Sequence, residues 1–149
     1  MPAKCGVRGQ NGRLADLYLS RDDQEAVRYD SEPETFKDRE QCRNFTELEL
    51  STLWAKIRGI EWDVNSLDEF HSVLVKDGGE RCIKRLPTTM TNELARLTPE
   101  QISPAASKWA ATDEMACDAA DVQPIIEGLV RLAKVASMQD RKLYSWNCT

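Results

Sequence analysis

The chain has 149 residues and a mass of 16.9 kDa, with 41% hydrophobic and 30% charged residues. This composition is typical of one globular domain and is too apolar for a disordered tail. The longest apolar runs are far shorter than the ~18 residues that cross a bilayer, and the first residues lack an apolar core of signal-peptide length. The sequence therefore excludes membrane-spanning, collagen-like and coiled-coil proteins. It predicts a single domain over residues 1–149, located in the cytoplasm.

The net charge is −5, from 20 basic and 25 acidic residues, and the pI is near 5.0. This balance argues against nucleic acid or an anionic membrane as the partner, because phosphate binding needs clustered Lys and Arg. The acidic excess is local: residues 22–49 hold ten acidic and four basic side chains, a charge of −6. Such a surface commonly serves solubility alone. The alternative is a docking surface for a basic protein.

The N-terminal part carries few signals of regular structure. Leu17–Leu19 is predicted to be extended, and acidic residues after Ser20 and Ser31 indicate two weak helix starts. We therefore expect an acidic, less regular part over residues 1–44 and a helical core over residues 45–149.

The first helix of that core is predicted from Thr46 to Gly59. Thr46 and Glu49 fit a capping box, in which each side chain bonds the backbone of the other residue. Apolar residues then recur at steps of three and four, and the glycine ends the helix. A second helix is predicted from Ser66 to Asp77, with Leu67, Phe70 and Leu74 as its apolar face.

The rest of the chain is predicted to alternate between short strands and helices. Residues 81–86 and 142–146 are expected to be extended. A short helix is expected after Pro87, then a single turn over residues 99–102, because Pro104 cannot lie in a helix interior. Ser103 is expected to begin a new helix that reaches Met115, and a long amphipathic helix is predicted over residues 122–138. These elements predict a mainly α protein of the α+β type: a single-domain bundle of about five to six helices with a small two- or three-stranded sheet.

The five cysteines lie at positions 5, 42, 82, 117 and 148, and no pair has the C-x2-C spacing of a zinc or redox site. With one histidine in the chain, a Cys/His metal centre is not expected. The cysteines are predicted to be reduced thiols, mostly in the core. No metal and no cofactor is expected.

Groups suited to catalysis are sparse. His71 is the single imidazole, and the chain lacks the nucleophile-elbow, dinucleotide-binding, P-loop and HExxH motifs. Two carboxylate clusters, at residues 113–121 and 61–69, could bind a metal ion, but Asp121 is placed to cap the final helix, and Asp68 and Glu69 lie in the first turn of a predicted helix. The sequence therefore predicts that the protein is not an enzyme. The alternative is a small enzyme or ligand-binding protein in which His71 meets Asp68, Glu69 or a thiol.

Among the four tryptophans, Trp54 and Trp109 lie on predicted apolar faces and are expected in the core. Trp62 lies between Glu61 and Asp63 in a connecting segment. It is either an exposed anchor of a protein interface or a ring folded back over the core.

Three segments resemble small acidic bacterial proteins of unknown or toxin-immunity function. They are Leu53–Gly59, Ala110–Glu114 and Leu143–Cys148, the last following a long final helix. The resemblance implies a toxin-neutralising role, and it transfers no catalytic residue.

Together these observations predict a non-catalytic protein-binding domain, specifically an immunity or antitoxin protein that occludes a basic toxin or effector. Acidic side chains are expected to steer the partner, and an aromatic anchor is expected to slow its dissociation. The predicted contact residues are Asp22, Asp23, Glu61, Trp62, Asp63, Asp68 and Glu69. Both a monomer and a homodimer are compatible with the sequence.

Overall fold

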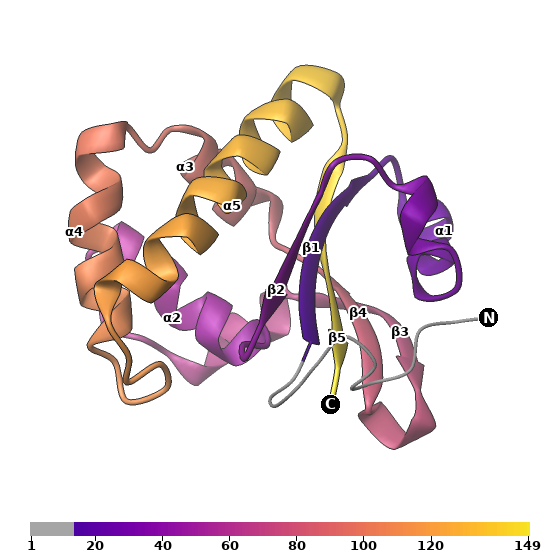
Figure 1. The fold of residues 1–149 in the computed structure, drawn as a ribbon, viewed down its shortest axis with the longest axis horizontal. Coiled ribbons are helices and arrows are strands. Elements are labelled where there is room, and N and C mark those ends of the chain that lie inside the picture. The colour runs from indigo at the N-terminus through magenta and orange to yellow at the C-terminus, as the bar shows by residue number, and fades with distance from the viewer. Residues whose placement is uncertain (1–13) are drawn as a thin grey trace.

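The computed structural model describes residues 14–149, and its centre is a five-stranded antiparallel sheet (Figure 1). The strands are β1 (Leu14–Ser20), β2 (Arg39–Arg43), β3 (His71–Lys76), β4 (Arg81–Arg85) and β5 (Lys142–Cys148). They lie in the order β2-β1-β5-β4-β3, so the last strand of the chain pairs with the first. The three stretches predicted to be extended lie in β1, β4 and β5, but the prediction of a small sheet of two or three strands is wrong, because β2 and β3 add two strands that were not predicted.

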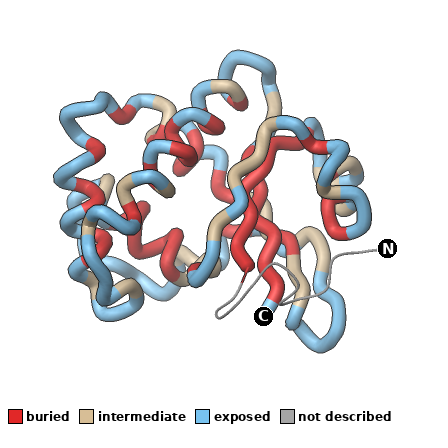
Figure 2. Tube along the Cα trace, in the orientation of Figure 1, coloured by how far each residue is buried: buried red, intermediate tan, exposed pale blue. Residues whose placement is uncertain are grey.

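Helices cover both faces of this sheet. The α-helices are α1 (Asp23–Ala26), α2 (Glu47–Arg58), α3 (Thr88–Ala95), α4 (Pro99–Ala110) and α5 (Ala119–Gln139). Helices α2 to α5 gather on one side of the sheet, and α1 lies on the other with the 3-10 turns that follow it (Figure 1). Strands β1 and β5 are consequently buried along almost their whole length (Figure 2).

Strand β1 sends alternate side chains into two hydrophobic cores. Leu17 and Leu19 join the larger core, under α2 to α5. Tyr18 joins a smaller aromatic core on the opposite face, where its ring stacks on Tyr29 with centroids 4.0 Å apart. A strand buried on both faces shows no polar alternation in its sequence. This explains why only its central residues were predicted to be extended.

The predicted helix from Thr46 to Gly59 is confirmed as α2. Thr46 Oγ1 accepts a hydrogen bond from the Leu48 backbone N–H at 3.3 Å, and Glu49 Oε1 accepts one from the Thr46 N–H at 2.5 Å. Gly59 ends the helix with φ at +68°, a conformation that other residues adopt only with strain. The long final helix is also confirmed as α5, although Asp118 rather than Asp121 precedes its first turn.

Pro104 lies inside α4, which runs without a break from Pro99 to Ala110. The predicted single turn over residues 99–102 and the new helix from Ser103 to Met115 are therefore wrong. A proline in a helix removes one hydrogen bond to the carbonyl four residues before it, here that of Glu100. Both Glu100 and Pro104 are exposed, so water can satisfy that carbonyl and the helix continues.

The predicted helix over residues 66–77 is also wrong. The structure has a 3-10 helix over Val64–Glu69, followed by strand β3. The spacing of Leu67, Phe70 and Leu74 fits a helix, but residues 71–76 instead pair with β4 in a hairpin. The turn of that hairpin, Asp77–Gly79, contains two glycines with positive φ. His71 therefore lies on the edge strand of the sheet and not on a helix.

Three of the four described cysteines are free thiols as predicted, but none of these three is fully buried in the core, and the fourth is not a free thiol. Cys42 and Cys82 are free and partly buried, Cys117 is free and exposed, and Cys148 at the end of β5 is disulfide-bonded. Burial raises the pKa of the Cys82 thiol, and the carboxylate of Glu47 raises it further. Burial likewise raises the pKa of the Cys117 thiol. The prediction for Cys5 lies outside the described residues.

Candidate functional site

The connection between α2 and β3 exposes apolar side chains that alternate with carboxylates. Ile60 is 49% exposed, Trp62 40% and Val64 59%. These are three of the five large hydrophobic residues exposed in the described part of the chain. Glu61 and Asp63 lie between them in the sequence. We call residues 60–69 the 60–69 loop, and it holds four acidic residues and no basic one. Clustered apolar exposure of this kind marks interaction surfaces in soluble proteins.

Trp62 is fixed at one edge by a hydrogen bond and remains 40% exposed. Its indole Nε1 donates a hydrogen bond to Ser51 Oγ on α2 at 2.8 Å. Asp63 orders the following turn, because its Oδ1 accepts a hydrogen bond from the Asn65 backbone N–H at 2.9 Å. The ring is tied to α2 and remains 40% exposed, and its role as an anchor of a protein interface stays a prediction.

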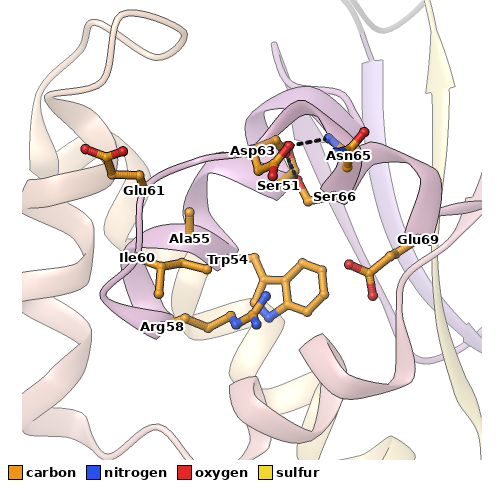
Figure 3. A pocket seen from close by; sticks show the side chains of 10 residues that line it. All are labelled: Ser51, Trp54, Ala55, Arg58, Ile60, Glu61, Asp63, Asn65, Ser66 and Glu69. Carbon is orange, nitrogen blue, oxygen red and sulfur yellow. Dashed lines mark hydrogen bonds between the residues drawn. The ribbon is translucent and has the colours of Figure 1, made fainter.

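A pocket of about 240 Å³ lies between α2 and the 60–69 loop (Figure 3). Its lining consists of side chains from both segments: Ser51, Trp54, Ala55, Arg58, Ile60, Glu61, Asp63, Asn65, Ser66 and Glu69. Of the three exposed apolar residues of the loop, only Ile60 lines this pocket, together with the loop carboxylates of Glu61, Asp63 and Glu69.

The aromatic part of this pocket is the indole of Trp54. Its Nε1 donates a hydrogen bond to Glu93 Oε1 on α3 at 2.5 Å, which fixes the ring in its plane. The guanidinium carbon of Arg58 lies 4.7 Å from the ring centroid, within cation–π distance. In Figure 3 the carboxylate of Glu69 points toward this ring, whereas Glu61 points away from it.

Five of the seven predicted contact residues lie in the 60–69 loop: Glu61, Trp62, Asp63, Asp68 and Glu69. Asp22 and Asp23 lie elsewhere, at the start of α1 on the opposite side of the sheet (Figure 1). Asp22 caps this short helix by accepting a hydrogen bond from the Glu25 backbone N–H at 2.8 Å. The structure thus divides the predicted set into one compact group and one helix start.

Asp23 is held by groups of the sheet. Its carboxylate accepts hydrogen bonds from the Tyr144 hydroxyl at 2.7 Å and from Arg85 at 2.5 Å. Partial burial opposes ionisation of Asp23, but these two hydrogen bonds and the positive charge of Arg85 act against it, and the pKa of Asp23 lies below its usual value. Asp23 therefore joins α1 to the sheet, and a partner that paired with it would compete with Arg85.

His71 meets neither Asp68 nor Glu69. Its Nε2 lies 3.7 Å from Asp23 Oδ2, and its side chain is 56% exposed on the edge strand β3. The carboxylate beside this exposed imidazole is already paired with Arg85. The arrangement gives no support to the alternative of a His71-based enzyme.

Sequence reasoning missed the contact between Trp54 and Arg58. Trp54 was assigned to the core from its apolar helix face, and it is indeed only 2% exposed. The signal was present in the sequence, because a residue four positions along a helix lies on the same face. Nothing in the sequence of α2 alone showed that the 60–69 loop would turn back beside this pair.

Other functional assignments find no support in the described residues. Over residues 14–149 no helix is long and apolar enough to cross a membrane, and no group of histidine, cysteine, aspartate and glutamate is arranged to hold a metal ion. Comparisons with protein-family models, with curated proteins and with solved structures give no match for this chain.

Proposed function

We propose that this protein is a non-catalytic binding domain whose 60–69 loop docks onto a basic protein. One observation carries the proposal: Ile60, Trp62 and Val64 are exposed in the same loop that holds four carboxylates. Protein interfaces combine an apolar centre, often aromatic, with a polar rim. A carboxylate-rich rim around an apolar centre is complementary to a surface on which Lys and Arg surround an apolar patch.

The two components of this surface act at different stages of binding. Carboxylates attract a basic partner over several ångströms and raise the association rate, an effect that salt screens. Trp62 is already held by Ser51, so it loses little conformational freedom when a partner covers it. It is therefore suited to slow dissociation, which is where most affinity differences between related complexes arise.

The proposal extends to neutralisation by occlusion. A bound domain of this size covers part of a basic toxin or effector and blocks its target site without any reacting group of its own. An immunity or antitoxin function is the form of this proposal that the resemblance of the sequence suggests. The features of the site that support an occluding role are the exposed Ile60, Trp62 and Val64 and the four carboxylates of the 60–69 loop.

Affinity capture from the source organism tests the proposal. The bait is the full chain, compared with Trp62→Ala and with Met138→Ala, which removes an 82% exposed apolar side chain far from the loop in sequence. We expect a basic protein to bind the wild-type chain and Met138→Ala at low salt and to be lost from Trp62→Ala. Equal capture by all three baits, or capture of acidic proteins only, would contradict the proposal.

The compartment and the oligomeric state of the protein also bear on this proposed function. The cytoplasm remains the compartment predicted from sequence, although the disulfide of Cys148 is more typical of oxidising compartments. Fractionation of the source cells, with the thiols alkylated before lysis, decides between the cytoplasm and an oxidising compartment. Sedimentation of the purified chain decides between a monomer and a homodimer, and a homodimer that covers the 60–69 loop would leave no surface for the partner.

A further inference from the structure

Arg58 occupies the face of an aromatic ring that lines the pocket. It lies four residues after Trp54 in the last turn of α2, and its guanidinium carbon is 4.7 Å from the centroid of that ring. Across residues 14–149, Arg58 has no carboxylate partner, so the ring is its one specific contact there. Arg58 is exposed, and a single exposed cation–π contact is weak. The side chain can therefore leave the ring at low cost.

The ring itself is held in place when Arg58 leaves. Trp54 is anchored through its indole Nε1 to Glu93 on the neighbouring helix α3. Its polar edge is thus satisfied inside the protein, and its face is directed to the pocket. Removal of Arg58 would expose an aromatic face of fixed orientation.

The pocket carries more negative than positive charge even with Arg58 in place. Three carboxylates line it, from Glu61, Asp63 and Glu69, against one guanidinium. Neither Glu61 nor Glu69 has a hydrogen bond or ion pair with any described residue. The Glu69 carboxylate also points toward the Trp54 ring (Figure 3). An incoming cation therefore finds both an aromatic face and a free carboxylate.

The size of the pocket and the shape of the cation indicate which kind of cation fits. The pocket measures about 240 Å³, below the ~300–1,000 Å³ of sites that enclose drug-sized ligands, so it suits one side chain. A planar guanidinium stacks on an indole and pairs in two hydrogen bonds with a carboxylate, whereas an ammonium group is a compact, strongly hydrated charge. The observed occupant, Arg58, is itself a guanidinium.

Building on the proposed function, we propose that this pocket receives an arginine side chain of the basic partner. The arginine takes the place of Arg58 on the Trp54 ring and pairs with Glu69. In the free protein Arg58 covers the ring and keeps it from water. Arg58 is therefore a competitor of the partner's arginine, and its removal should strengthen binding of an arginine side chain.

A peptide titration tests this inference without the natural partner. The probe is acetyl-Gly-Arg-Gly-amide, added to the ¹⁵N-labelled full chain while the indole N–H signal of Trp54 is followed by NMR. Arg58→Ala is compared with Lys56→Ala, which removes an equal charge from the same last turn of α2 outside the pocket lining. We expect the dissociation constant of Arg58→Ala to be about threefold to tenfold lower than that of the wild type, and Lys56→Ala to change it less than about twofold.

Two controls separate recognition of arginine from general attraction. The neutral citrulline peptide has nearly the same shape and should leave the Trp54 signal in place. Glu69→Gln, an exposed substitution, should weaken binding of the arginine peptide about twofold to threefold. The inference is overturned if Arg58→Ala and Lys56→Ala bind alike, if the citrulline peptide binds equally well, or if the Trp54 signal does not move.

Failure of this inference and failure of the proposed function give different results. If the arginine peptide ignores Trp54 while capture of a basic protein still depends on Trp62, the loop docks the partner and the pocket takes no arginine. If the peptide binds at Trp54 while capture is unaffected by Trp62→Ala, the pocket recognises guanidinium and the docking role of the loop is wrong.

Discussion

The indole Nε1 of Trp62 donates a hydrogen bond to the hydroxyl of Ser51 across 2.8 Å and ties the 60–69 loop to helix α2. Ser51 is 1% exposed, whereas Trp62 remains 40% exposed. One edge of the ring is therefore fixed to the protein while the residue stays partly accessible to solvent. An aromatic residue that is ordered before binding is the kind that dominates interface energetics.

Replacing Ser51 with alanine should release this ring. We expect the free energy of unfolding to fall by about 0.5–1.5 kcal/mol, the usual net value of one hydrogen bond, in urea titrations. The loss should be smaller in a Trp62→Phe background, because phenylalanine has no N–H to donate. Ser137→Ala, exposed on α5, serves as the control. Equal losses in the two backgrounds would mean that Ser51 acts through its other hydrogen bond, to the Leu48 carbonyl.

Asp30 is the buried carboxylate that joins the N-terminal segment to the sheet. It is 4% exposed, accepts a hydrogen bond from Trp146 Nε1 at 2.9 Å, and pairs with Lys76 at 3.1 Å and with Arg81 at 3.4 Å. Asp30→Ala leaves Trp146 Nε1 and Lys76 without this acceptor and Arg81 with Asp77 alone, and we expect a loss of about 3 kcal/mol in denaturant unfolding. Asp77→Ala is the matched control. It removes the exposed carboxylate that also pairs with Arg81, and should cost less than about 1 kcal/mol.

The lowered pKa of Asp23 predicts that the folded protein loses stability in acid. Hydrogen bonds from Tyr144 and Arg85 keep the pKa of Asp23 lower in the folded protein than in the unfolded chain. The unfolded chain therefore binds the proton more readily. Ionised Asp23 stabilises the fold above the pKa of the unfolded chain, near 4, and this contribution disappears as the pH falls through the folded pKa.

Urea midpoints between pH 7 and pH 3 test this expectation. The wild type should exceed Asp23→Asn in stability at pH 7, and the difference should shrink as the pH falls below about 4. Glu34→Gln, which removes an exposed carboxylate of the same N-terminal segment, should give a small difference that changes little with pH. A difference between wild type and Asp23→Asn that is the same at every pH would contradict the assignment.

All three tyrosines, Tyr18, Tyr29 and Tyr144, should resist ionisation in the folded protein. Burial is the main cause that raises the pKa of each, and nearby carboxylates add to it. The folded state keeps its phenolic protons above pH 10, where the unfolded chain releases them, so stability should fall as the pH rises beyond 10. Phenolate absorbance should therefore appear together with loss of the near-ultraviolet circular dichroism. Phenolate formation with a midpoint near pH 10 in protein that remains folded would contradict the burial of these rings.

The sequence predicted those helices whose first and last residues are set by residues close by in the chain. The capping box of Thr46 and the glycine at position 59 fix α2 within one stretch of chain. The sheet was underestimated because strand pairing is not local. Strand β2 lies at the edge and consists of Arg39–Arg43, which shows no apolar alternation. Residues 71–76 have a helical apolar spacing that only their pairing with β4 overrides.

In the candidate site, too, features set by neighbouring residues could be predicted, whereas contacts between distant segments could not. Trp62 between two carboxylates was evident from adjacent residues in the sequence. The pocket beside it depends on how Gly59 reverses the chain and how Glu93 on α3 holds the Trp54 ring, contacts between segments far apart in the chain. Asp22 and Asp23 were grouped with the loop on charge alone. Their actual roles as a helix cap and as a partner of Arg85 arise from the fold.

The dissociation rate of the captured basic protein tests the central claim most directly. Surface plasmon resonance with immobilised wild type, Trp62→Ala and Met138→Ala measures it on matched surfaces. If the 60–69 loop is the docking surface, Trp62→Ala should release the partner about 30-fold faster or more, the loss expected of an interface hot spot, and Met138→Ala should match the wild type. Equal dissociation from all three surfaces would show that the partner binds elsewhere on the molecule.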